Sequence, residues 1–181
     1  MAKSERPTLV DAALKQLDDS NDRAVAIVGA TLVEAALEDA IVSRLLPMSS
    51  NHRKALFESD SSYTFAGKID LGLSLGLYGK ETKLDLHRIK KIRNEFAHNI
   101  ERDFSHSRIA PICALLMDRR TGKPLTPKDL EGAPKKLVEY VTVGREMRFR
   151  FLMAVFSFAA GLARESAEHP WQPPQPTELP D

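Results

Sequence analysis

The stretch Arg93-Asn94-Glu95-Phe96-Ala97-His98 lies near the end of a helical pattern that runs from Thr82 to about Asn99. Each residue of an α-helix is rotated by about 100° from the one before it, so the pattern divides this segment into two faces. The apolar face contains Leu86, Ile89, Ile92, Phe96 and Ala97. The polar face contains Lys83, His87, Lys90, Asn94 and His98. The sequence therefore predicts an amphipathic helix that packs against other helices.

Arg93 departs from this division, because its direction lies between those of Leu86 and Ile89, inside the apolar face. A buried guanidinium without a partner is costly, so we expect Arg93 to meet a carboxylate or a subunit interface. The candidate carboxylates are Glu34 and Glu38, which are four residues apart on one face of an otherwise apolar helix. We therefore expect a structural ion pair that joins Arg93 to these glutamates. The alternative is that both glutamates lie on a solvated edge.

His98 points in another direction, since it is rotated by about 140° from Arg93 along the same helix. The two side chains converge only if the helix ends at His98, or if a second copy of the chain supplies one of them. Asn94 precedes His98 by four residues, so its amide can reach the imidazole and orient it. A site built from these three residues would therefore depend on the helix end or on a dimer.

The order of Arg93, Asn94 and His98 resembles the Arg-polar-x-x-x-His motif of the HEPN superfamily. Many HEPN proteins are metal-independent endoribonucleases, and their site is usually built at a two-fold dimer interface. The resemblance implies that His98 is a general acid or base, that Arg93 holds the phosphate and that Asn94 orients His98. No metal or other cofactor is then expected. Affinity for the RNA backbone would come from three further side chains of the same helix, namely Lys90, Lys91 and His87.

The wider arrangement over residues 24–109 resembles the mannitol operon repressor family. The matching stretches are residues 27–35, 71–77 and 93–98, with Asp103 and Phe104 beyond them. The resemblance implies a role in transcription regulation. The sequence shows no clear helix-turn-helix with a basic recognition helix, so a regulator of this type would act through a protein partner. We therefore predict a regulatory protein that acts through a protein partner, with a HEPN-like endoribonuclease as the alternative.

Composition limits the class of protein. The chain has 181 residues, 43% of them hydrophobic, which is enough for one domain with a full core. A formal net charge of +1 argues against a strongly basic nucleic-acid binder but permits a local basic patch. The single cysteine, Cys113, excludes an internal disulfide. The N-terminus lacks an apolar signal region, and the longest apolar run is shorter than the about 20 residues that span a bilayer, so we expect a cytoplasmic protein.

Hydrophobic periodicity predicts helices along most of the chain. We expect a single all-α domain over residues 8–167, a bundle of about six to seven helices that forms a homodimer. Residues 1–7 are expected to fray, and the Pro-rich residues 168–181 to be disordered. The helix expected from about residue 21 to 46 is apolar on nearly all sides, which is typical of a central or interface helix. The last helix, expected over residues 134–167, carries arginines that we interpret as solvated: Arg145, Arg148, Arg150 and Arg164.

Overall fold

The computed structural model describes residues 21–57, 63–116 and 146–168. These segments contain six α-helices and no β-strand: α2 (Asp22–Val42), α3 (Ser50–Phe57), α4 (Phe65–Ser74), α5 (Lys80–His98), α6 (Ala110–Ala114) and α8 (Glu146–Glu168). The predicted all-α bundle is therefore confirmed. Three features expected from the sequence lie outside the described residues: the frayed residues 1–7, the start of the last helix at residue 134, and residues 169–181 of the Pro-rich tail.

The helix α2 begins with a side-chain cap and ends with a tightened turn. Asn21 Oδ1 accepts a hydrogen bond from Ala24 N at 2.8 Å, which satisfies one of the free amides of the first turn. The helix ends at Val42 rather than at about Leu46. The earlier end has two causes: backbone bonds between residues three apart close the chain at residues 41–45, and the residue before Pro47 is disfavoured in a helical conformation.

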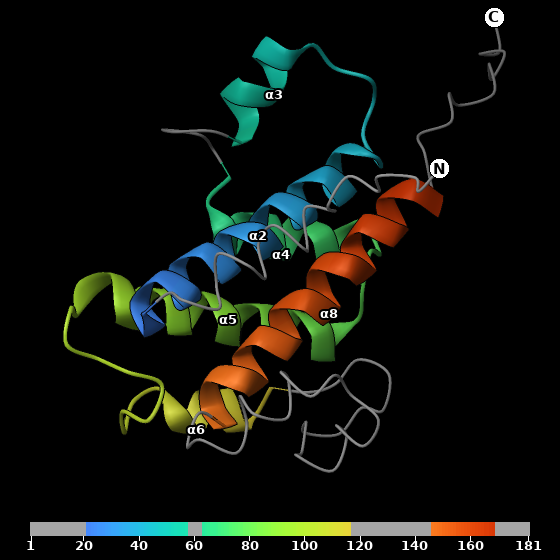
Figure 1. The fold of residues 1–181 in the computed structure, drawn as a ribbon. Helices are drawn as coiled ribbons and strands as arrows, with labels where there is room; N and C mark the ends of the chain where they lie inside the picture. Colours follow the sequence, from blue (N-terminus) through green and yellow to red (C-terminus); the bar gives the residue numbers. More distant parts are fainter. Residues whose placement is uncertain (1–20, 58–62, 117–145, 169–181) are drawn as a thin grey trace, which may run out of the picture.

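The centre of the bundle is α2. Figure 1 shows it between α8 on one side and α4 and α5 on the other, in agreement with the contacts among these helices. The close approach of α8 depends on Gly29, since a Cβ there would lie 3.0 Å from Phe151 Cε1 and 3.3 Å from Val155 Cγ2. The largest fully buried side chains of the common core are Leu37, Ile41, Ile69, Leu86, Ile89, Ile92, Phe96, Ile109, Leu116, Phe151, Phe158 and Leu162.

The helix that carries Arg93 and His98 is α5, and it begins at Lys80, two residues before the predicted start at Thr82. The chain reverses early because α4 ends in a Schellman motif. Gly76 adopts a φ of +71°, and Leu77 N donates to Gly72 O at 3.0 Å. This turn leaves only Tyr78 and Gly79 before α5, and Gly79 at the N-cap position supplies no side-chain cap. The turn therefore sets where α5 starts, and Thr82 lies inside the helix.

The arginines of α8 are less solvated than we expected. Arg148 is buried, and its Nη1 lies 2.8 Å from Asp22 Oδ1. Arg150 is 13% exposed, with its Nη2 2.8 Å from Glu146 Oε1. Their interpretation as solvated residues was wrong because α8 packs against both α2 and α6, which covers two of its sides. Arg164 is exposed, and Arg145 lies outside the described residues.

None of the helices in the described segments combines the length and the hydrophobicity that a membrane span requires. The six helices instead bury a shared core, and they bring charged side chains of α2, α3, α4 and α5 to one region of the molecule.

Gly72 and Gly67 of α4 give a matched pair of substitutions. A Cβ at Gly72 would lie 2.5 Å from Tyr78 Oη, which donates to Ile69 O at 2.8 Å. Gly72→Ala is therefore expected to lower the free energy of unfolding by about 1–3 kcal/mol. A Cβ at Gly67 would make an ordinary contact with Tyr63 Cδ1 at 3.6 Å, so Gly67→Ala is expected to raise it by up to about 1 kcal/mol. Urea denaturation followed by circular dichroism measures both, and equal effects would contradict the Tyr78 contact.

Candidate functional site

Arg93 lies where α5 contacts α2. Its Nη2 is 3.4 Å from Glu34 Oε2, and its Nη1 donates to Asn94 Oδ1 at 3.2 Å. The Arg93 side chain is 34% exposed, so the guanidinium is neither sealed in the core nor surrounded by water. Of the two glutamates that the sequence offered as partners, the structure places Glu34 beside Arg93, while Glu38 contacts other cations.

A buried lysine that sequence reasoning missed lies between the two glutamates. Lys68 of α4 is 4% exposed, and its Nζ lies 3.2 Å from Glu34 Oε1 and 2.9 Å from Glu38 Oε2. The same Nζ is 5.8 Å from the centroid of the Phe57 ring, within the range of a cation–π contact. A signal was present in the sequence, because Lys68 shares a helix face with Phe65, which is also buried.

The pairing continues to α3, where Arg53 lies 2.8 Å from Glu38 Oε1 and 2.6 Å from Asp39 Oδ1. We call the resulting set of six side chains the charge network: Glu34, Glu38, Asp39, Arg53, Lys68 and Arg93. It contains three carboxylates and three cations, and it joins α2, α3, α4 and α5. The network is therefore electrically balanced.

The charge network lowers the pKa of Glu38. Burial alone would raise this pKa, but hydrogen bonds and charges from Lys68 and Arg53 outweigh burial and hold it below its ordinary value of 4.5. Because the pKa is lower in the folded state than in the unfolded state, ionised Glu38 stabilises the fold at neutral pH. This contribution is present above the unfolded pKa and is lost as the pH falls through the folded pKa.

His98 is the last residue of α5, and its side chain is exposed. Asn99 follows it with extended backbone angles, so the helix does end at His98. Asn94 Oδ1 accepts its hydrogen bond from Arg93, and among the described residues no hydrogen bond joins Asn94 to the imidazole. The structure therefore brings Arg93 and Asn94 together but does not bring His98 to them within one chain.

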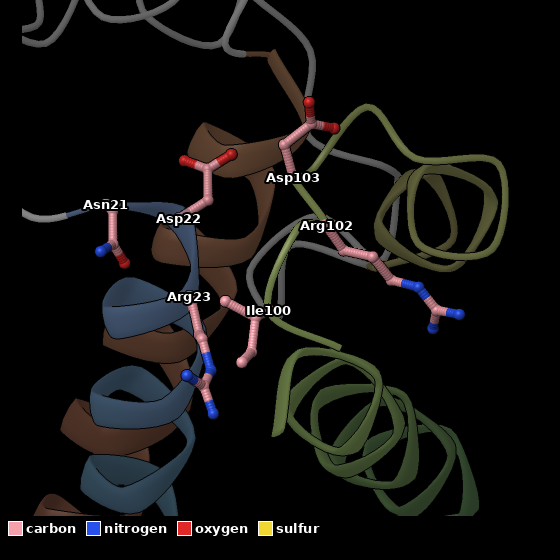
Figure 2. Close-up of a pocket in the computed structure, with 6 residues that line it drawn as sticks. All are labelled: Asn21, Asp22, Arg23, Ile100, Arg102 and Asp103. Atoms are coloured by element: carbon pink, nitrogen blue, oxygen red, sulfur yellow. The ribbon is translucent and has the colours of Figure 1, made fainter. Parts of the chain in front are cut away.

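An open pocket of about 350 Å³ lies between the start of α2 and the turn after α5 (Figure 2). It is lined by Asn21, Asp22, Arg23, Ile100, Arg102 and Asp103. Neither Arg93 nor His98 belongs to this lining, so the pocket does not unite the residues of the HEPN-like motif.

Both arginines of the pocket already have partners. Arg23 donates from Nε to Phe96 O at 3.1 Å and from Nη2 to Ala97 O at 3.3 Å, which satisfies free carbonyls in the last turn of α5. Arg102 forms an ion pair with Glu95, and Figure 2 shows its guanidinium pointing away from the pocket. These arginines therefore fasten the end of α5 rather than offer a site for an anion.

The outward side of α5 carries a second group of charges. At 100° per residue, four lysines and two histidines fall within a sector of about 100°. We call these six residues the basic face: Lys80, Lys83, His87, Lys90, Lys91 and His98. It includes the three side chains that we expected to contact phosphate, namely His87, Lys90 and Lys91.

One carboxylate of α4 contacts the basic face. Asp70 Oδ1 lies 2.7 Å from Lys83 Nζ and 3.9 Å from His87 Nε2. Partial burial, followed by the charge of Lys90, lowers the pKa of His87 below its ordinary value of 6.5, so its imidazole is neutral at pH 7. Within the part of the chain that the structure describes, Lys80, Lys90 and Lys91 form no ion pair. The lysines therefore supply the positive charge of this face.

Comparison with protein-family models gives no match, and neither the curated proteins nor the solved structures give one. Within residues 21–57, 63–116 and 146–168, no group of three or more His, Cys, Asp or Glu side chains is placed to hold a metal ion.

Lys68→Met tests the charge network. The substitution keeps the length of the side chain but leaves Glu34 and Glu38 with one cation each. Loss of one partner from a buried ion pair costs about 3–5 kcal/mol, and we expect about 2–3 kcal/mol here because both glutamates keep another partner. Lys91→Met on the exposed side of α5 is the control, with an expected change below about 0.5 kcal/mol. Urea denaturation at neutral pH measures both.

The same comparison has an expected pH dependence. Protonation of Glu38 removes its attraction to Lys68, so the stability difference between the parent and Lys68→Met is expected to be largest at neutral pH. It should shrink as the pH falls below the unfolded value of 4.5. A difference that stays constant across this range would show that Lys68 stabilises the fold by packing alone.

Proposed function

We propose that this protein is a cytoplasmic, non-enzymatic regulatory module that acts by binding a protein partner. The contact between Arg93 and Glu34, at 3.4 Å, is the observation that carries the proposal. A nuclease site would need this guanidinium for phosphate, yet it is already paired with a carboxylate. Asn94 is likewise bonded to Arg93 instead of the imidazole of His98. The resemblance of residues 27–35, 71–77 and 93–98 to the mannitol operon repressor family agrees with a regulatory role.

The charge network suits such a module. Buried ion pairs add little net stability, but they accept few alternative arrangements because each charge must keep its partner. In this chain the network joins α2, α3, α4 and α5. The four helices are thereby held in one register, and the outward side of α5 is presented as a rigid surface.

We also propose that the module forms an isologous dimer through the outward side of α2. Val28 is 41% exposed, and the exposed Thr31 and Ala35 lie on the same side of the helix. This strip is uncharged, so two copies can meet without repulsion. The basic face of α5 is unsuited to such a contact, because it would place like charges opposite one another.

Val28→Lys tests the dimer. The new charge would be buried against its own copy, so the variant is expected to be monomeric where the parent is dimeric. Light scattering coupled to size-exclusion chromatography gives the molar mass of each, with Lys91→Ala on α5 as the control that stays dimeric. A parent that is monomeric at all tested concentrations would refute the dimer.

A HEPN-like endoribonuclease is the second candidate. Two observations favour it: His98 is exposed at the end of α5, and Arg93 keeps 34% of its side-chain surface exposed. This candidate needs a different dimer from the one proposed above, in which Arg93 of one chain would hold the phosphate beside His98 of the other. His98 would remove the proton of the 2′-hydroxyl, whose oxygen then bonds to the adjacent phosphorus while the bond from phosphorus to the 5′-oxygen breaks. The products are a 2′,3′-cyclic phosphate and a 5′-hydroxyl, which takes up the proton from His98.

Incubation with labelled single-stranded RNA in EDTA separates the two candidates. A regulatory module is expected to leave the RNA intact, and His98→Ala is expected to be indistinguishable from the parent. His106→Ala is the matched control, because this histidine lies outside α5. Cleavage by the parent and by His106→Ala that disappears in His98→Ala would overturn the non-enzymatic proposal and support the nuclease.

A further inference from the structure

We propose that the basic face of α5 is a docking site for an acidic amphipathic helix of a partner protein. This inference rests on the proposed regulatory function and names the chemistry of the partner. Four lysines lie on one side of a single 19-residue helix, and Asp70 is the carboxylate that contacts this side in the described residues. A row of four lysines in which only Lys83 has a carboxylate partner among the described residues favours an occupant of opposite charge.

The spacing of the lysines fits a helical occupant. Lys83 and Lys90 are seven residues apart, which places them about 10.5 Å apart along the helix axis, and Lys80 and Lys91 are about 16.5 Å apart. Carboxylates seven residues apart on a second helix have the first spacing, and carboxylates eleven residues apart, which would meet Lys80 and Lys91, have the second. Asp70 forms an ion pair with Lys83 and places a negative charge at the side of the basic face next to α4. An acidic partner is therefore repelled there and directed toward Lys80, Lys90 and Lys91.

An exposed leucine distinguishes a protein partner from a nucleic acid. Leu84 is 47% exposed, and its neighbours one turn away are Lys80, Glu81, His87 and Arg88, with Lys91 two turns further on. An exposed apolar side chain at the border of the basic face can bury the apolar stripe of an amphipathic helix, whereas a phosphate backbone gains nothing from it. The basic face contains no Phe, Tyr, Trp or Arg, so its rings are two imidazoles and it offers no guanidinium for a two-point contact with phosphate.

The face is already held in place before a partner binds. The inner side of α5 is fixed by buried Leu86, Ile89 and Ile92, and by the contact of Arg93 with Glu34. Binding therefore orders mainly the ends of the lysine side chains, which lowers its entropic cost. A second copy of this chain is a poor occupant, because it would present the same positive charges.

The test uses a fluorescein-labelled helical peptide of Glu and Leu, about 20 residues long to match α5, with the leucines on one face. Binding to the full chain is followed by fluorescence anisotropy at low salt. We expect saturable binding that weakens as salt is added, and none with the peptide in which Gln replaces Glu. Absence of binding by the acidic peptide, or equal binding by the Gln peptide, would overturn the proposal.

Charge-matched variants locate the site. Lys90→Glu with Lys91→Glu is expected to weaken peptide binding by at least about tenfold. Lys54→Glu with Arg108→Glu changes the net charge equally at exposed positions off α5, so it is expected to weaken binding by less than about threefold. Leu84→Ser leaves the charge unchanged and is expected to weaken binding severalfold. Circular dichroism and thermal unfolding verify that each variant is folded, and equal losses in the two double variants would refute a docking site on α5.

Polyuridylate of matched charge is the competing probe. The proposal predicts that it binds more weakly than the acidic peptide and is insensitive to Leu84→Ser. Tighter binding of polyuridylate, lost in the Lys90 and Lys91 double variant, would overturn the acidic-helix partner in favour of nucleic acid. Because these measurements report affinity and not RNA cleavage, the docking proposal can fail while the non-enzymatic function stands, and the reverse also holds.

Discussion

The ammonium group of Lys68 limits how these helices can pack. A charge with 4% of its residue surface exposed must be paired, so α4 can lie only where Glu34 and Glu38 of α2 reach it. The two glutamates in turn attract Arg93 from α5 and Arg53 from α3. A single buried cation thus connects four helices, and the apolar core fills the space between them.

Glu34 is shared between two cations, and this sharing makes the same contacts compatible with both a regulatory role and a nuclease. Glu34 contacts both Lys68 and Arg93, and Arg93 is partly exposed. If Arg93 turned toward a phosphate, three carboxylates would share two cations, but Glu34 would still have Lys68 as a partner. The pairing of Arg93 therefore favours a structural role in one chain, while a dimer that draws Arg93 away is physically accessible.

The features that could be predicted from the sequence are those that depend on hydrophobic periodicity. The all-α class and the amphipathic character of α5 follow from regular apolar spacing. The place of Arg93 inside that spacing predicts a carboxylate or a subunit interface as its partner, with Glu34 and Glu38 as the candidate carboxylates. Which glutamate it meets depends on the angle between α2 and α5, which no local pattern encodes. The burial of Lys68 depends on how α4 packs against α2, which the local sequence of α4 does not encode.

The errors at helix ends and on α8 have similar causes. Several glycines surround the turn after α4, and the structure shows that Gly76 is the one in the left-handed conformation. The resulting turn lets α5 begin at Lys80, earlier than the sequence predicts. Arg148 was taken as solvated because it lies on a helix with charges on several sides. Its burial follows from the packing of α8 on both α2 and α6, a fact of tertiary structure.

Two consecutive residues at the start of α2 join segments that are far apart in sequence. Asp22 accepts hydrogen bonds from Arg148 of α8 and from the backbone of Phe104, and Arg23 bonds the final carbonyls of α5. Fraying of this one turn would release all three segments together. Local unfolding at this end of the bundle is therefore cooperative, and the backbone around His98 is only as stable as the first turn of a helix more than seventy residues earlier in the chain.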